Sequence, residues 1–138
     1  MKSFQKELLF DVPSRMDCIV ITPEVEEFVA ECRVEEGIVL CSALEATSSV
    51  FFSDNDYGIK ADILEWIEKN APHRPLAAYH HNSSGLENGD ALIKALLLGR
   101  SVTLALTGGA LEIGGGDIFY GEFDGRKRKR ILIKIIGE

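Results

Sequence analysis

Two adjacent histidines, His80 and His81, are the residues of this sequence best suited to carry chemistry. A general base needs a group that orients it, and a catalytic metal site needs about three protein ligands. The third histidine, His73, lies in a proline-flanked segment, where we expect it to be exposed. Candidate partners for His81 are therefore acidic: Glu45, Asp62, Glu87, Asp90 and Asp117. One histidine with carboxylates can form an acid–base site, but it makes a weaker metal site than three histidines.

Two glycine-rich or polar segments could bind a ligand, and each also has a structural explanation. The stretch GGALEIGGGD lacks the Gly-Lys-Ser/Thr of a P-loop and is followed by a strand-like sequence. Its glycines favour tight turns, and a ligand-lining role for Gly114 is the alternative. Asn88 and Asp90 precede a predicted helix, which either could cap. The alternative there is an anion held at the helix N-terminus.

The basic run Arg126–Arg130 is a third candidate. On a strand, its arginines would share one face and its lysines the other. The simplest interpretation is a solvated flank of a hairpin. The alternative is an anion site in which Arg126 and Arg128 bind phosphate.

Composition excludes several classes of protein. The 138 residues predict one domain, 1–138, and are 46% hydrophobic and 27% charged. A net charge of −7 argues against a nucleic-acid partner. No apolar run approaches the roughly 20 residues of a membrane span, and the N-terminus lacks a signal-peptide pattern. The three cysteines lie in apolar runs without a CxxC pair, which indicates buried free thiols and a cytoplasmic protein.

Hydrophobic periodicity predicts the elements that must position these residues. We expect helices from residue 22, over 59–70 and over 88–98, the last capped by Gly99. We expect strands over 3–12, 16–22, 37–44, 45–53, 77–81, 101–107, 110–113, 117–123 and 126–136. The strands 37–44 and 45–53 would pair, and Asp124-Gly125 would close a hairpin. Hairpins mixed with helices predict an α+β fold with a largely antiparallel sheet.

In this order, the segments resemble the YjbQ family. The resemblance rests on EEGIVLCSALEATSS, Asp62, YHHN, ENGDALIKALLLGRSV, GALEIG and the final Gly137-Glu138. It implies a compact α+β sandwich with about three helices that forms a homotrimer, with sites near the subunit boundaries. It also implies an activity described as secondary thiamine-phosphate synthase-like, although the family is largely uncharacterised.

The chain departs from the family pattern at several positions. Glu45 stands where the pattern has a histidine before two hydroxyl residues, and Leu92 replaces a second histidine. Gly115-Gly116-Asp117 replaces Thr-Trp-Gln, and Ser53-Asp54 replaces Asn-Glu. The residues that remain are Asp62, His81, Asn88, Thr47 and the glycine-rich frame. The resemblance thus implies a site with His81 and Asp62 as catalytic residues, or Glu45, Asp62 and His81 as ligands of a divalent metal.

Three functions follow from these observations. The first is an enzyme that joins or transfers a small phosphorylated molecule, with His81 as acid–base and Thr47, Asn88, Gly114, Arg126 and Arg128 around the substrate. The second is a divergent, non-catalytic paralogue that keeps a small-molecule pocket or acts as a scaffold trimer. The third, a polyanion binder that uses the basic run, is disfavoured by the negative net charge.

Overall fold

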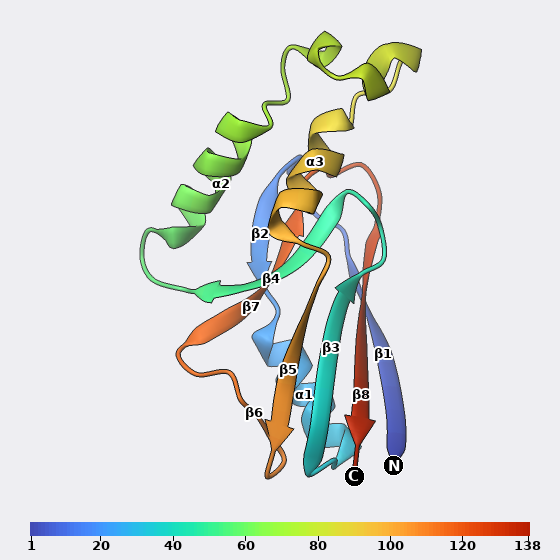
Figure 1. Cartoon of the computed structure of the whole chain (residues 1–138), viewed down its shortest axis with the longest axis vertical. Coiled ribbons are helices and arrows are strands. Elements are labelled where there is room, and N and C mark those ends of the chain that lie inside the picture. Colours follow the sequence, from blue (N-terminus) through green and yellow to red (C-terminus); the bar gives the residue numbers. More distant parts are fainter.

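The computed structural model describes residues 1–138 and contains two antiparallel sheets and three α-helices (Figure 1). The elements run in the order β1 (Lys2–Phe10), β2 (Asp17–Val20), α1 (Thr22–Cys32), β3 (Glu36–Ala43), β4 (Ser48–Asp54), α2 (Ile59–Asn70), η1 (Leu76–Ala78), η2 (His80–Ser84), α3 (Gly89–Leu98), β5 (Ser101–Thr107), β6 (Ala110–Leu111), β7 (Gly116–Glu122) and β8 (Lys129–Gly137). The predicted α+β class is confirmed.

The larger sheet has the strand order β1-β8-β3-β5-β6, and the smaller has the order β2-β7-β4. The last strand, β8, therefore lies between β1 and β3, antiparallel to both. Close backbone approach at one end of this sheet requires glycine. A Cβ on Gly37 would lie 2.1 Å from the carbonyl oxygen of Ile136, so no larger residue fits there without a backbone shift.

The main core lies between the two sheets and is closed by α1. Ile131, Ile133 and Ile135 alternate along β8 and are completely buried. From α1, Val25 and Phe28 join the same cluster, at the helical spacing that the sequence predicts. Complete burial of an aliphatic side chain contributes about 1.5–3 kcal/mol, so this cluster dominates the favourable energy of folding.

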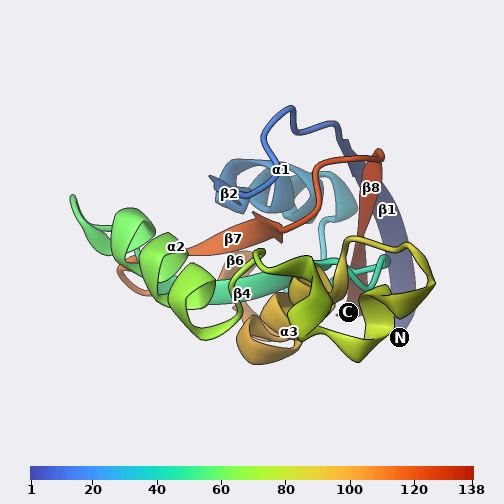
Figure 2. The same cartoon turned by 90° about the horizontal axis from the view of Figure 1, so that it is seen from above.

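The helices α2 and α3 lie at the opposite end of the molecule from α1 (Figures 1 and 2). From α2, Ile63 and Leu64 pack on a small cluster that includes Phe51 of β4. From α3, the small residues Ala91 and Ala95 pack on Phe123. These two clusters are much smaller than the main core, so polar contacts must supply part of what holds α2 and α3 in place. None of the helices is long and apolar enough to cross a membrane.

Two predicted strand pairings were wrong. The strand β4 pairs with β7 in the smaller sheet, whereas its expected partner β3 pairs with β5 and β8. The turn at Asp124-Gly125 does not close a hairpin, because β7 and β8 belong to different sheets. Gly125 has the positive φ of 68° that a turn residue favours. The segment 123–128 uses this turn to cross from one sheet to the other, which leaves Arg126 and Arg128 in a loop rather than on a strand.

The expected strand over 77–81 was also wrong, because this segment forms the short 3-10 helices η1 and η2. The side chain of Asn82 explains the difference. Its Nδ2 donates to the carbonyl oxygen of Leu76 at 2.9 Å, and its Oδ1 accepts from the backbone N–H of Gly89 at 3.0 Å. Local side-chain bonds of this kind compete with a strand ladder. They tie the segment between α2 and α3 into a separate lobe.

Candidate functional site: a cleft beside α3

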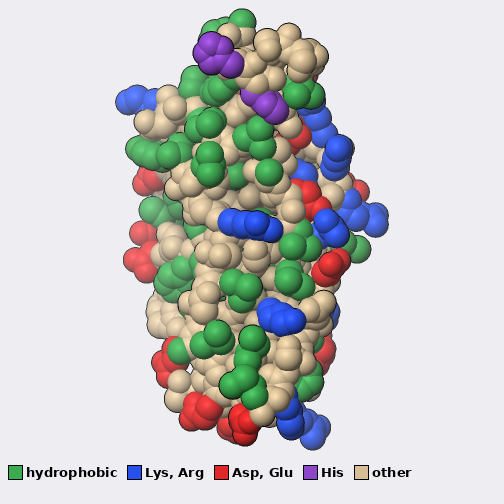
Figure 3. Space-filling model, turned by 45° about the vertical axis from the view of Figure 1, so that its right-hand side comes forward, with side chains coloured by type: hydrophobic (Ala, Val, Ile, Leu, Met, Phe, Trp, Pro, Cys, Tyr) green, Lys and Arg blue, Asp and Glu red, His purple; other side chains and the backbone are tan.

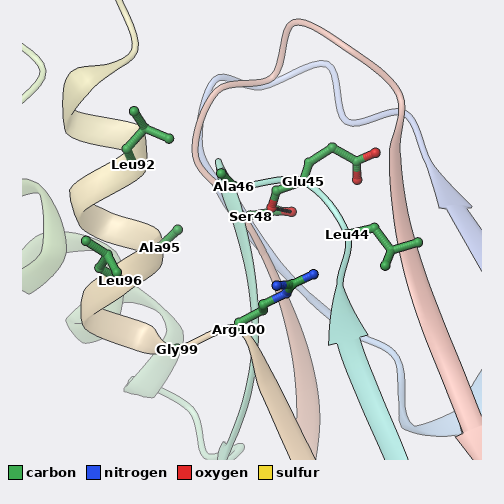
Figure 4. A pocket seen from close by; sticks show the side chains of 9 residues that line it. All are labelled: Leu44, Glu45, Ala46, Ser48, Leu92, Ala95, Leu96, Gly99 and Arg100. Carbon is green, nitrogen blue, oxygen red and sulfur yellow. Dashed lines mark hydrogen bonds between the residues drawn. The ribbon is translucent and has the colours of Figure 1, made fainter. Parts of the chain in front are cut away.

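A cleft of about 440 Å³ lies between α3 and the segment that joins β3 to β4 (Figure 4). The residues that line it are Leu44, Glu45, Ala46, Ser48, Leu92, Ala95, Leu96, Gly99 and Arg100. They come from three stretches of sequence, which the antiparallel sheet and the end of α3 bring together. A concave site of this volume, largely apolar with a few polar groups, is typical of small-molecule sites.

One wall of the cleft is apolar because of the helical spacing of Leu92, Ala95 and Leu96. The sequence predicts that these residues share one stripe of α3, and the structure confirms it. Ala95 is buried, but the side chain of Leu96 is 76% exposed. The stripe therefore only partly faces the protein, and the rest of it faces the cleft and solvent.

Arg100 supplies the free positive charge of the cleft. It follows the helix cap Gly99, and its Nε donates to the carbonyl oxygen of Ala43 at 2.9 Å. The Ala43 backbone N–H donates in return to the Arg100 carbonyl oxygen at 2.9 Å. These two bonds fix the base of the side chain, and the guanidinium extends toward the segment from Leu44 to Ser48 (Figure 4). No carboxylate pairs with this guanidinium, so its two terminal nitrogens remain available as donors.

Glu45, in contrast, is already paired. Its carboxylate accepts from the backbone N–H of Arg130 at 2.8 Å and from the Arg130 Nε at 2.9 Å. Partial burial alone would raise the pKa of Glu45, but these bonds hold it below the ordinary value. The side chain points away from α3, toward β8 (Figure 4). The charge of Glu45 is therefore neutralised by Arg130 at the rim of the cleft. Because Arg100 has no such partner, the cleft has a net positive charge.

His81 lies in the lobe between α2 and α3. Its ring is exposed, and its Nε2 is 2.9 Å from Oδ1 of Asn88. Asn88 is the N-cap residue of α3 but makes no capping bond through its side chain. Of the residues predicted for the site, these two are brought into direct contact. A separate cavity of about 400 Å³ in the lobe is lined by His80 rather than by His81.

The three residues predicted as metal ligands are not brought together within one chain. No group of three or more His, Cys, Asp or Glu side chains could hold a metal ion. Glu45 is bound to Arg130, and His81 to Asn88. Asp62 is exposed in the first turn of α2 and is bonded to neither. These three side chains come from different parts of the fold and do not form one site within a single chain.

The other predicted site residues lie apart from the cleft. Thr47 is buried in the turn between β3 and β4, whereas its neighbours Ala46 and Ser48 line the cleft. Gly114 is exposed in the turn between β6 and β7, with a φ of 63° that supports its structural role. Arg126 forms ion pairs with Glu87 and Asp124. Arg128 is exposed in the same loop, as a solvated charge.

A partly buried ionic cluster, formed by Arg15, Glu68, His73, Asp90 and Lys94, was not anticipated. Lys94 is completely buried, and its Nζ donates to Asp90 Oδ2 at 2.6 Å and to Glu68 Oε1 at 2.8 Å. Arg15 pairs with the same two carboxylates, and His73 Nδ1 is 3.0 Å from Asp90 Oδ1. His73 is thus partly buried rather than exposed. Asp90 bonds to Lys94 four residues along α3, a spacing that could have indicated the pair.

A second buried ion pair joins Lys129 to Glu122. Lys129 Nζ donates to Glu122 Oε2 at 2.5 Å, and the Tyr120 hydroxyl donates to Oε1 of the same carboxylate. The backbone N–H groups of Asp124 and Gly125 also donate to Oε2, at 3.1 and 2.8 Å. The basic run is therefore divided. Lys129 is internal and structural, and the residues before it are exposed.

The surface shows no single basic face in the view of Figure 3. Lysine and arginine side chains are dispersed among acidic and hydrophobic ones, and the histidines lie near one end. This distribution agrees with the negative net charge and does not favour a nucleic-acid interface on this face.

Comparisons with known proteins agree with the resemblance in the sequence. The family described as "UPF0047 protein YjbQ-like" matches residues 6–138. A UPF0047 protein of Archaeoglobus fulgidus is 34% identical over 94% of this chain and 99% of its own length. The structure of a YbjQ-like protein of unknown function from Sulfolobus solfataricus superposes with a TM-score of 0.93 over 99% of both chains, at 24% identity, which is a likeness of fold.

A further structure, an uncharacterised conserved protein of the YjbQ/UPF0047 family from Clostridium acetobutylicum, is similar with a TM-score of 0.86. It is 28% identical over 95% of this chain and 99% of that one. The match extends over almost the whole length in each case, and the two solved structures share the overall fold. On these grounds, the chain belongs to the YjbQ-like UPF0047 family.

Proposed function

We propose that this protein binds a small phosphorylated molecule in the cleft beside α3 and acts as a non-catalytic binding protein. The observation that carries the proposal is the guanidinium of Arg100, which is anchored through Nε to Ala43 and has no acidic partner. Arginine binds phosphate through two parallel N–H donors, and both terminal nitrogens are available here. Glu45 does not oppose an anion in the cleft, because Arg130 already pairs with it.

Calorimetric titration with inorganic phosphate, and then with thiamine phosphate, tests this proposal. A hydrogen bond to a charged group contributes about 1.5–3 kcal/mol, so Arg100→Gln should weaken binding about 10- to 100-fold. Lys127→Gln is the matched control, because it removes a cation from an exposed loop that does not line the cleft. Equal binding by the wild type and Arg100→Gln would refute the proposal.

A second candidate function is a thiamine-phosphate synthase-like enzyme with His81 as acid–base. The supporting observation is the bond between His81 Nε2 and Asn88, because a base that is oriented through one ring nitrogen presents the other to a substrate. Thiamine phosphate formation from its phosphorylated precursors would be measured for the wild type, His81→Ala and His80→Ala. Activity that is lost in His81→Ala but kept in His80→Ala would favour the enzyme. No turnover in the wild type would leave the binding protein as the proposal.

We also propose that the protein works as a homotrimer in the cytoplasm. Leu9 and Ile38 are 57% and 49% exposed on the strands β1 and β3 of the larger sheet, and apolar faces of this kind are often covered by another copy. All three cysteines are free thiols, as is usual in a reducing compartment. Light scattering during gel filtration would give the mass. A monomer at micromolar concentration would exclude the trimer.

A further inference from the structure

We infer that the ligand of the α3 cleft is an anionic amphiphile, a molecule with a single anionic, oxygen-bearing head group and an uncharged, apolar body. This inference rests on the proposed function, since it uses the same cleft and the same anchor, Arg100. It goes further by assigning the chemistry of the rest of the ligand. It also excludes the polar sugar phosphates that a general phosphate site would accept.

The apolar body follows from the wall opposite the anchor. Leu92 of α3 points across the cleft (Figure 4), and Leu96 and Leu44, the latter just after β3, also line it. Leu96 is 76% exposed, so a ligand that covers it removes apolar surface from water. Hydroxyl groups of a sugar would find no partner along these leucines, and a desolvated polar group without a partner is costly.

That the ligand has a single anionic head group follows from the polar groups that remain free. The only charged residues that line the cleft are Glu45 and Arg100. Both oxygens of Glu45 accept from Arg130, and the Ser48 hydroxyl donates to the backbone oxygen of Glu45 at 3.1 Å. Arg100 alone is left to bind an anion. A second anionic group on the ligand would find no free cation among the residues that line the cleft.

The volume agrees with a small amphiphile. About 440 Å³ corresponds to some fifteen water molecules at about 30 Å³ each. This space accommodates a chain or ring of several carbons together with its head group. Both a phosphate monoester and a carboxylate could supply the head, because the guanidinium fork fits either one.

Titration of the intact protein with short amphiphiles tests the inference. The probes are inorganic phosphate, butyl phosphate, hexyl phosphate, ribose 5-phosphate, hexanoate and hexyltrimethylammonium. We expect Kd to fall two- to fourfold per added methylene from butyl to hexyl phosphate, because each buried methylene contributes up to about 0.8 kcal/mol. Ribose 5-phosphate should bind no better than inorganic phosphate. The ratio of hexanoate to hexyl phosphate affinity shows which head group is preferred.

Two variants on the same helix locate the apolar contact. Leu96→Ser should remove most of the increase in affinity that a longer alkyl chain of the probe brings, whereas Leu97→Ser should retain this increase. Both leucines are substantially exposed, at 76% and 49%, but only Leu96 lines the cleft. Because neither belongs to a buried cluster, both variants should fold, and thermal unfolding checks this.

The outcomes separate the two proposals. If inorganic phosphate and ribose 5-phosphate bind through Arg100 but a longer alkyl chain does not increase affinity, the inference of an amphiphilic ligand is refuted and the anion site remains. If hexyltrimethylammonium binds as tightly as hexyl phosphate, the assigned charge is wrong. If no anion binds and Arg100→Gln changes nothing, the proposed function itself fails.

Discussion

Lys94→Met should destabilise the protein more than any other lysine substitution on α2 or α3. The Lys94 Nζ lies between the carboxylates of Asp90 and Glu68, and the side chains of Lys94 and Asp90 are 0% and 1% exposed. Methionine fills nearly the same space, so the change removes the charge and leaves the packing close to native. The buried Asp90 carboxylate then loses its nearest cation.

The magnitude follows from the burial of the pair. Removing one partner of a buried ion pair costs about 3–5 kcal/mol, because the remaining charge is desolvated without compensation. Arg15 and His73 still contact Asp90, which favours the lower end of this range. For a chain of this length, each kcal/mol lowers Tm by about 3–4 °C, so we expect a decrease of roughly 10 °C.

Urea and thermal unfolding of five proteins would measure this effect. The set is the wild type, Lys94→Met, Asp90→Asn and the double variant, with Lys69→Met as the control. Lys69 is exposed in the last turn of α2 and forms no ion pair, so its substitution should change stability by less than about 0.5 kcal/mol.

The double variant isolates the interaction between the two charges. If Lys94 and Asp90 stabilise each other, the double variant should be more stable than the sum of the single effects predicts, by 1–3 kcal/mol. Additive changes in the free energy of unfolding would refute the view that this cluster holds α3 against α2. A loss of stability in Lys94→Met that is no larger than in Lys69→Met would refute it as well.

Three further outcomes are expected. Burial alone would raise the pKa of Glu68, but bonds from Lys94, the His73 backbone and Arg15 hold this pKa at about 2, below the ordinary 4.5. The contribution of Glu68 to stability is therefore complete above pH 4.5 and should be lost as the pH falls to 2. Urea midpoints measured across this pH range would contradict the prediction if Glu68→Gln and the wild type showed the same pH dependence. Gly37→Ala should destabilise by at least 1–3 kcal/mol, because its Cβ meets backbone, and an unchanged unfolding midpoint would contradict the observed register. Burial raises the pKa of Cys41 to about 12, so its thiol should resist iodoacetamide at pH 8 until urea unfolds the chain, and rapid labelling of the native protein would be inconsistent with that burial.

Much of the fold could be predicted from local patterns, because those patterns reflect local physics. The spacing of Val25, Phe28 and Val29 identifies α1, and Gly99 marks the end of α3. Strand partners could not be predicted in the same way. Neighbouring strands usually pair, but β3 and β4 belong to different sheets, and only the tertiary arrangement decides this. The segment 77–81 was misassigned because its apolar and aromatic residues suggest a strand, whereas the side-chain bonds of Asn82 to the backbone at Leu76 and Gly89 hold it in 3-10 turns.

The candidate site was less predictable than the fold. Sequence reasoning identified the histidines and carboxylates by their chemical type, but it did not predict the contact between His81 and Asn88. It overlooked Arg100, because a single arginine after a helix cap is unremarkable until Ala43 and Leu44 are brought beside it. It treated Glu45 as a free ligand, because the partner Arg130 is 85 positions away.

The position of β8 in the larger sheet has a consequence for synthesis on the ribosome. β1 pairs with β8 and with no other strand, and its partners lie well over a hundred positions away in sequence. While the chain is being made, β1 therefore emerges well before β8 and remains without a partner until β8 has been synthesised. Domains with such distant contacts fold slowly and expose unpaired edges in the meantime. The nascent protein should thus depend on chaperones until β8 is available, and loss of β8 would leave β1 and β3 without their shared neighbour.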